Sequence, residues 1–87
     1  MSLKSVDLRG VTISPAIIEL VPESMARENL IIPLMEVDGI LQIVMSDPFD
    51  FDTLTKLQFI LNKSIQPVVA PKEQIVEAIN RHYFGLT

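Results

Sequence analysis

Hydrophobic and polar residues alternate near the start of the chain. Residues 6–10 run apolar, polar, apolar, polar and end at a glycine, which predicts a short strand. Ser14 followed by Pro15 is typical of a helix start, because a proline suits the first helical turn. The apolar positions that follow are interrupted by Pro22. We therefore expect either two short helices between residues 15 and 30 or one helix kinked at Pro22.

Two apolar runs then flank the dipeptide Asp38-Gly39. Asp-Gly between apolar runs is a strong signal for a tight β-hairpin. Pro33 cannot donate a backbone hydrogen bond, so the first strand should lie at the edge of a sheet or begin after this residue. Residues 40–45 are almost continuously apolar, which predicts a central strand or one covered on both faces.

The second half of the sequence predicts a helix, a strand and a second helix. Asp50 or Asp52 can cap the first of these helices, whose apolar stripe consists of Leu54, Leu57, Phe59, Ile60 and Leu61. Residues 65–70 include the β-branched Ile65, Val68 and Val69 and predict a strand, in which Pro67 favours an edge or an end. The last helix should begin at Pro71, with Phe84 still in its apolar stripe and Gly85 where a C-terminal cap commonly lies.

This mixture of elements around one hairpin predicts an α+β fold, a small sheet packed with helices. We expect a single domain over residues 6–85. Residues 1–5 are expected to be a tag or a disordered start.

The composition restricts the classes of function. Of the 87 residues, 48% are hydrophobic and 21% are charged, as in a folded domain. The net charge of −4 has the wrong sign for a nucleic-acid surface, so we expect no nucleic-acid partner. The absence of cysteine excludes disulfides and Cys-based zinc sites. No apolar run approaches the roughly 20 residues of a membrane helix. We expect a soluble, cytoplasmic domain without direct membrane insertion.

Three carboxylates, Asp47, Asp50 and Asp52, form the one cluster of residues in the sequence that could bind a hard metal ion such as Ca²⁺ or Mg²⁺. They lack the glycine turn and the closing glutamate of a calcium loop. The interpretation favoured here is that they cap a helix and oppose the positive end of its dipole. Metal binding or acid–base catalysis at this cluster is the alternative.

His82 is the only histidine, and it stands near the end of the last helix. A protonated histidine there would meet the negative end of the helix dipole, with pH sensing or general-base chemistry as the alternative. The three glycines are far apart, so no phosphate-binding glycine loop exists. Met25, Met35 and Met45 could line an adaptable partner groove or fill the core. We assign no catalytic, cofactor-binding or metal-binding residue from these patterns.

Charge is also divided unevenly along the chain. Residues 1–53 hold nine acids and three bases, whereas residues 54–87 hold two acids and four bases. This polarity could orient an interaction, or it could be incidental.

Several short sequence segments together resemble those of a known family. They include Pro33-Leu34, residues 41–48 (Leu-Gln-Ile-Val-Met-Ser-Asp-Pro), Asp50, Leu57-Gln58-Phe59, residues 67–70, Ile75, Ala78-Ile79 and Tyr83. In this order they are similar to the N-terminal domain of type II secretion and type IV pilus assembly ATPases, the family of general secretory pathway protein E. The resemblance runs from Val6 to Gly85. Val44 departs from it, since the family usually has alanine there.

The resemblance implies a bacterial, non-catalytic coupling domain that docks a motor to the inner-membrane assembly platform. Its partners would be a platform component and its own ATPase domain, in a parent that is a homo-hexamer. Some relatives bind cyclic di-GMP through upstream Arg-Leu-Gly repeats, and this chain contains no Arg-Leu-Gly. Because some relatives bind this ligand, the alternative function is a regulatory domain that senses a cyclic dinucleotide and is attached to another bacterial enzyme such as a glycosyltransferase. A small metal-dependent enzyme that uses Asp47, Asp50 and Asp52 is the third hypothesis.

Overall fold

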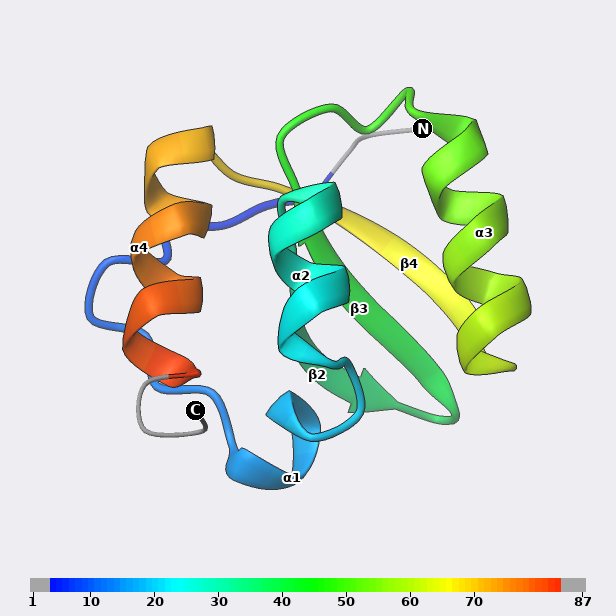
Figure 1. The fold of residues 1–87 in the computed structure, drawn as a ribbon, viewed down its shortest axis with the longest axis horizontal. Helices are drawn as coiled ribbons and strands as arrows, with labels where there is room; N and C mark the ends of the chain where they lie inside the picture. The colour runs from blue at the N-terminus through cyan, green and yellow to red at the C-terminus, as the bar shows by residue number, and fades with distance from the viewer. Residues whose placement is uncertain (1–3, 84–87) are drawn as a thin grey trace.

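Four strands form one mixed sheet in the computed structural model, which describes residues 4–83 (Figure 1). They are β1 (Lys4–Ser5), β2 (Ile31–Val37), β3 (Ile40–Met45) and β4 (Ser64–Val69). Their order across the sheet is β1-β4-β3-β2, with β1 and β3 parallel to β4 and with β2 antiparallel to β3.

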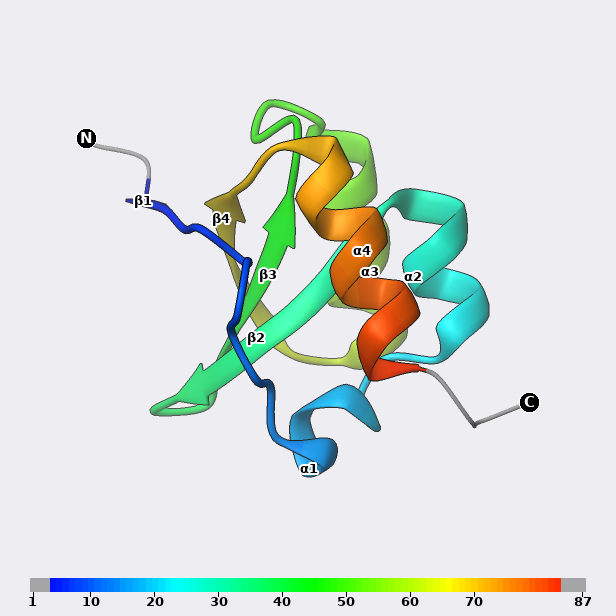
Figure 2. The ribbon, with the colours of Figure 1, turned by 90° about the vertical axis from the view of Figure 1, so that its left-hand side faces the viewer.

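The helices are α1 (Pro15–Ile18), α2 (Glu23–Asn29), α3 (Phe51–Leu61) and α4 (Lys72–His82). Figures 1 and 2 together place α2, α3 and α4 on the same side of the sheet. The predicted α+β class is confirmed, and of the two alternatives for residues 15–30 the structure has two short helices. Between residues 4 and 83, no helix has the length and apolar character that a membrane span needs.

The hairpin lies where the sequence predicts it. Asp38 and Gly39 have φ values of 52° and 78°, the two positive values that a type I′ turn requires. β3 lies between β4 and β2, and its residues from Leu41 to Met45 are buried, as expected for a central strand. Pro33 lies in the edge strand β2, and the pairing shifts between Pro33 and Met35. The prediction of an edge strand at Pro33 is therefore confirmed.

The opening strand lies earlier than predicted. Lys4 and Ser5 pair with Val68 and Val69, ahead of the expected strand over residues 6–10 and of the expected domain start at Val6. The alternating pattern still predicts that Leu8 is buried. However, the Leu8 amide donates to the side chain of Gln74 at 2.9 Å, so the backbone leaves the sheet at this point. The predicted strand over residues 6–10 was wrong for this reason.

α3 buries only part of its predicted stripe. Leu54 and Leu57 are buried, whereas Phe59 is 87% exposed and Ile60 is 52% exposed. A helix turns by about 100° per residue, so Phe59 stands about 200° from Leu57 around the axis. The prediction was wrong for Phe59 and Ile60 because an apolar residue type does not determine the direction of its side chain.

Pro67 lies within a paired strand, because β4 is hydrogen-bonded to β3 along its length and to β1 at its end. The Val69 carbonyl accepts the Val6 amide hydrogen, so alternate residues of β4 direct their backbone groups toward the β1 side. By this alternation the nitrogen of Pro67 also lies on the β1 side, one residue before the β1 pairing begins. The proline therefore removes no bond from the ladder between β3 and β4.

The core is aliphatic apart from Tyr83. It consists of Leu8, Ile13, Ile18, Val21, Ala26, Ile31, Ile32, Leu41, Ile43, Val44, Met45, Leu54, Leu57, Val68, Ala70, Ile75, Ala78, Ile79 and Tyr83. The Tyr83 hydroxyl donates to the Val21 carbonyl at 2.8 Å, and burial raises the pKa of Tyr83 to about 12. Phe84 and Gly85, predicted to extend and cap the last helix, lie outside the described residues.

Candidate binding surfaces

The acidic turn between β3 and α3 is held by its own hydrogen bonds. Asp47 Oδ1 accepts the Phe49 amide hydrogen at 3.0 Å. Asp50 is the N-cap of α3, since its Oδ1 accepts the Thr53 amide hydrogen at 3.2 Å and its Oδ2 accepts the Thr53 hydroxyl at 2.7 Å. These bonds to Thr53 lower the pKa of Asp50. The capping interpretation is therefore confirmed for Asp50.

Asp52 lies in the first turn of α3, where a negative charge opposes the helix dipole. Among residues 4–83, no three acidic or histidine side chains come together in an arrangement that could hold a metal ion. The turn acts locally, by ordering the backbone that begins α3.

A separate open cleft of about 660 Å³ lies at the C-terminal ends of the parallel strands. Its lining consists of Ser5, Val6 and Asp7 after β1, Ser46 after β3, Val69 and Ala70 at the end of β4, and Pro71, Lys72 and Gln74 at the start of α4. The carboxyl ends of parallel strands beside a helix start are a common place for ligands in sheets of this kind. Sequence reasoning missed this cleft, because its lining comes from three segments that only the strand pairing brings together.

Two polar side chains of the cleft, Gln74 and Asp7, already have partners. Gln74 Oε1 accepts the Leu8 amide hydrogen at 2.9 Å. The carboxylate of Asp7 forms an ion pair with the Arg9 guanidinium at 2.6 Å. This contact lowers the pKa of Asp7 to about 2 and raises that of Arg9. Among the described residues Lys72 forms no ion pair, so it gives the cleft one cation for an anionic group.

His82 lies in the last turn of α4, as the sequence predicts. Its Nε2 accepts the Ile13 amide hydrogen at 2.9 Å, and its Nδ1 lies 2.9 Å from the Ala78 carbonyl. The ring therefore binds the chain segment before α1, a contact that the sequence did not predict.

Arg81 holds the same segment. Its Nη2 donates to the carbonyls of Leu8 and Val11, each at 3.1 Å, while Nη1 forms an ion pair with Glu77 at 3.2 Å. Gln74, Arg81 and His82 thus tie α4 to residues 8–13. Gln74 lies in the first turn of α4 and Arg81 and His82 lie in its last turn, and we refer to this set of contacts as the α4 clamp.

The three methionines differ in their surroundings. Met45 is in the core, Met25 packs partly against it from α2, and Met35 is exposed on the hairpin. They lie on three separate elements, α2, β2 and β3. Of the two alternatives, filling the core applies to Met45.

Comparisons with known proteins find a matching sequence family and solved structures with a similar fold. The sequence model of the MshEN domain family matches residues 1–85. The type IV pilus assembly ATPase PilB of Myxococcus xanthus (strain DK1622) is 33% identical over 79 residues, which is 91% of this chain and 14% of that protein. The chain therefore spans only a small part of this relative.

Two solved structures are similar over 93% of this chain. The structure of MshE with cdg has a TM-score of 0.84 and 29% identity, and the match covers 59% of that chain. A structure of the N-terminal domain of XpsE has a TM-score of 0.81 and 21% identity, with 57% of that chain covered. At 21% identity, the similarity to the N-terminal domain of XpsE concerns the fold alone.

Proposed function

This chain belongs to the MshEN domain family, and from that premise we propose that it is the non-catalytic N-terminal coupling domain of a type II secretion or type IV pilus assembly ATPase. In this role it docks the motor to the inner-membrane assembly platform on the cytoplasmic side. The family match over residues 1–85 carries the proposal, supported by the 33% identity to a pilus assembly ATPase. The resemblance found from the sequence points to the same family.

The features of the chain agree with a coupling role. The sequence contains no G-x-x-x-x-G-K-[ST] loop, so ATP chemistry would be the task of another part of the parent, which we propose to be a homo-hexamer. The α4 clamp joins the start of the domain to its last helix, so the described body can move as one unit. A domain of this kind transmits motion through its surfaces and needs no reactive group.

The proposal is tested with the purified chain and with its parent motor. The chain alone should hydrolyse no ATP, and it should bind the cytoplasmic region of an inner-membrane platform protein of a pilus or secretion machine in isothermal titration calorimetry. A parent motor without these residues should retain ATPase activity and lose assembly in cells. ATP turnover by the chain alone, or normal assembly without it, would overturn the proposal.

Sensing of a cyclic dinucleotide is the second candidate function. It is favoured by the structure of MshE with cdg, that is cyclic di-GMP, which has 29% identity to this chain. The chain matches 59% of that protein and contains no Arg-Leu-Gly, so an essential part of such a site could lie in another segment.

A thermal shift titration with cyclic di-GMP distinguishes the two functions. A ligand that binds only the folded chain at 100 times its dissociation constant stabilises it by about 2.7 kcal/mol, which raises the melting temperature by several degrees. The sensing function predicts this shift with cyclic di-GMP and not with GMP. An unchanged melting temperature, both for this chain and for its parent, would exclude it.

A further inference from the structure

The three phenylalanines among the described residues are all exposed. Phe49 is 67% exposed, Phe51 is 64% exposed and Phe59 is 87% exposed, whereas the core is built from aliphatic residues and Tyr83. Aromatic side chains have large apolar surfaces, and they contribute much of the binding energy at protein interfaces. Their exposure in this domain therefore indicates a surface that another molecule covers.

Two of the three rings lie on exposed parts of α3, and the third lies just before it. Phe51 and Phe59 are eight residues apart on this helix, which corresponds to about 12 Å along its axis and about 80° around it. The helix buries Leu54 and Leu57 on its inner side. Phe49 lies just before the helix, and its ring meets that of Phe51 edge to face, with centroids 6.4 Å apart. We call Phe49, Phe51 and Phe59 the aromatic strip.

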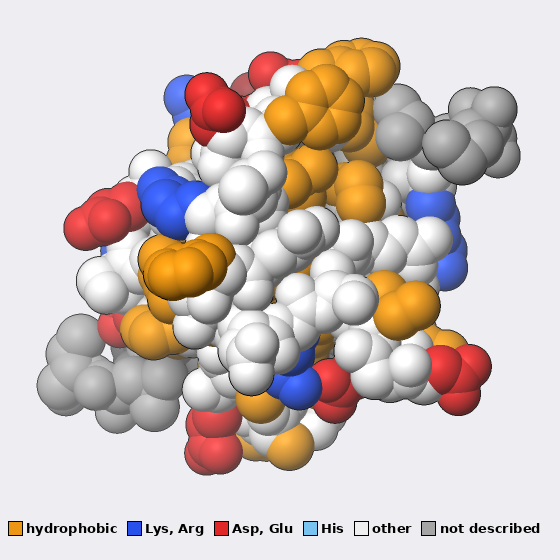
Figure 3. Space-filling model, turned by 90° about the vertical axis from the view of Figure 1, so that its right-hand side faces the viewer, with side chains coloured by type: hydrophobic (Ala, Val, Ile, Leu, Met, Phe, Trp, Pro, Cys, Tyr) orange, Lys and Arg blue, Asp and Glu red, His pale blue; other side chains and the backbone are white. Residues whose placement is uncertain are grey.

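In the space-filling view (Figure 3) the exposed apolar side chains of this face form separate patches. In Figure 3, hydrophobic side chains gather over the start of α3 at the top of the view, and acidic side chains border them. Complete burial of three aromatic side chains removes about 450–750 Å² from water. These three are already partly covered, so a partner would remove somewhat less. This is a large share of the roughly 800 Å² that each partner buries in a standard interface.

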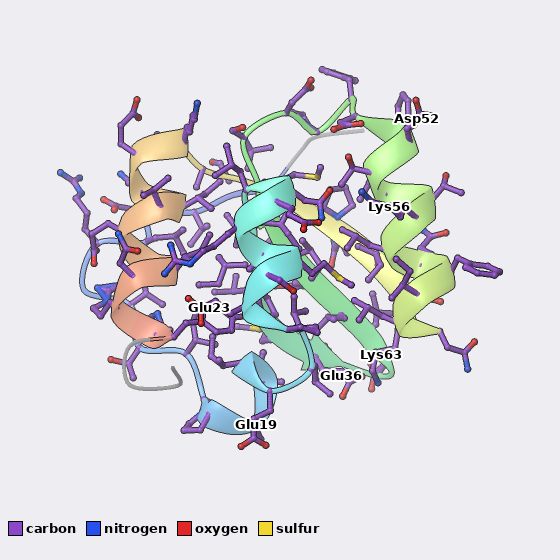
Figure 4. All side chains as sticks on the ribbon, in the orientation of Figure 1. Glu19, Glu23, Glu36, Asp52, Lys56 and Lys63 are labelled. Carbon is purple, nitrogen blue, oxygen red and sulfur yellow. The ribbon has the colours of Figure 1, made fainter. Side chains whose placement is uncertain are left out.

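The charges beside the strip are negative at one end. Asp47, Asp50 and Asp52 all lie at the N-terminal end of α3, beside Phe49 and Phe51. The two lysines of this region are engaged within the molecule. Lys56 donates to Asn29 Oδ1 at 2.8 Å, and Lys63 pairs with Glu36 at 2.7 Å (Figure 4).

A surface that complements the aromatic strip would be apolar, with positively charged side chains at the end that faces the three carboxylates. A second copy of this chain matches poorly, because each copy has a net charge of −4 and two such molecules repel each other. The length of the strip corresponds to two turns of a facing helix.

We propose that the aromatic strip binds an amphipathic helix of a partner protein, with lysine or arginine residues facing Asp47 and Asp52 and apolar residues facing Phe51 and Phe59. This inference rests on the proposed function, because it assigns the docking surface of the coupling domain. It also states the chemistry by which the platform protein would be recognised. The strip lies on α3, so it uses a surface separate from the cleft beside α4.

The test uses a designed helical peptide whose apolar face is leucine and whose flanks are lysine. Its affinity for the purified chain is measured by fluorescence anisotropy, and the contact is mapped by NMR amide shifts. A scrambled peptide of the same composition and a peptide with glutamate in place of lysine serve as controls. We expect binding of the lysine peptide only, with shifts confined to residues 47–60.

Matched variants locate the contact. Phe51→Ser with Phe59→Ser should weaken binding at least about tenfold, as hot-spot truncations do, while Met35→Ser with Val37→Ser on the exposed hairpin should leave it unchanged. Asp52→Asn should weaken binding about threefold and reduce its dependence on salt, whereas Glu73→Gln on α4 should have no effect. The substituted phenylalanines are exposed, and circular dichroism confirms that each variant is folded.

Three results would overturn the inference. They are equal binding of the scrambled peptide, unchanged affinity after both phenylalanine substitutions, and a dimer of the wild-type chain that the substitutions abolish. Binding of the platform protein to the wild-type chain and to the phenylalanine variant distinguishes a failure of this inference from a failure of the proposed function. If it binds the phenylalanine variant as well as the wild type, the aromatic strip is not the docking surface and the coupling function stands. If it does not bind the wild-type chain, the coupling function itself fails.

Discussion

Leu57 and Phe59 show how differently two apolar residues of one helix can be used. Leu57 is fully buried between α3 and the sheet, whereas Phe59 lies on the outer side of the same helix. Burial stabilises the fold through the apolar surface that is removed from water. An exposed side chain loses no such surface on folding, so Phe59 is free for a role other than stability.

The substitutions Leu57→Ala and Phe59→Ala should therefore have unequal effects. Leu57→Ala leaves a cavity in the core and should lower the free energy of unfolding by about 2–5 kcal/mol. Phe59→Ala should change it by about 0.5 kcal/mol or less, as exposed substitutions usually do. Urea denaturation of the two variants measures the difference, and equal losses would contradict the assigned burial.

Asp7 provides a second prediction at the scale of the residue. The hydrogen bonds from Arg9 lower the pKa of Asp7 from 3.8 to about 2. Because the folded state binds this proton less readily than the unfolded state, the contribution of Asp7 to stability is present above pH 4. It is lost as the pH falls toward 2. NMR titration of the Asp7 carboxyl carbon should give a midpoint near 2. Arg9→Ala should return the midpoint toward 3.8, and an unchanged midpoint would contradict the role of Arg9.

At the scale of the element, the hairpin turn depends on backbone conformation more than on packing. Gly39 has a φ of 78°, and a Cβ atom added there would meet nothing within 4 Å. A substitution at this position would therefore change the conformational energy of the turn without a steric clash. Residues with a Cβ rarely adopt this φ, with asparagine as a partial exception.

We expect Gly39→Ala to destabilise the domain by about 1–2 kcal/mol. Gly39→Asn should cost less, because asparagine tolerates the left-handed conformation better than alanine does. Thermal unfolding of both variants measures the order. The same loss in both variants would show that something other than the φ angle governs this turn.

At the scale of the whole molecule, α4 holds together parts of the chain that are far apart in sequence. The contacts of Gln74, Arg81 and His82 reach residues 8–13 across 66 to 73 positions of the sequence. Tyr83 extends this connection to the carbonyl of Val21, just after α1. The segment between β1 and α1 has little regular structure, so these side chains determine its path.

His82→Ala should destabilise the domain by about 1–3 kcal/mol, because it leaves the partly buried Ile13 amide without its acceptor. His82→Gln should retain most of the stability, since the glutamine carbonyl can reach a position similar to that of Nε2. Hydrogen exchange at Ile13 reports on the same bond, and it should accelerate in the alanine variant only. Unchanged exchange in that variant would contradict the clamp.

The sequence by itself determined those features that depend on neighbouring residues. The turn at Asp38-Gly39, an acidic cap at Asp50 or Asp52, the interruption of the helical pattern at Pro22 and the central position of β3 follow from local conformational preference and local hydrophobic patterns. Such signals act within a few residues of the chain, so they can be recognised without knowing the fold. The family could also be recognised from the sequence, because the segments that carry the resemblance are themselves short and local.

Only the tertiary structure decided which surfaces are covered. The exposure of Phe59, the contact of His82 with Ile13, the early position of β1 and the cleft lined by three separate segments all depend on contacts between residues far apart in the sequence. A hydrophobic residue in a helical pattern is consistent with either burial or exposure until the packing of the helix is known. In this domain that packing leaves Phe51 and Phe59 exposed, because α3 meets the sheet through Leu54 and Leu57.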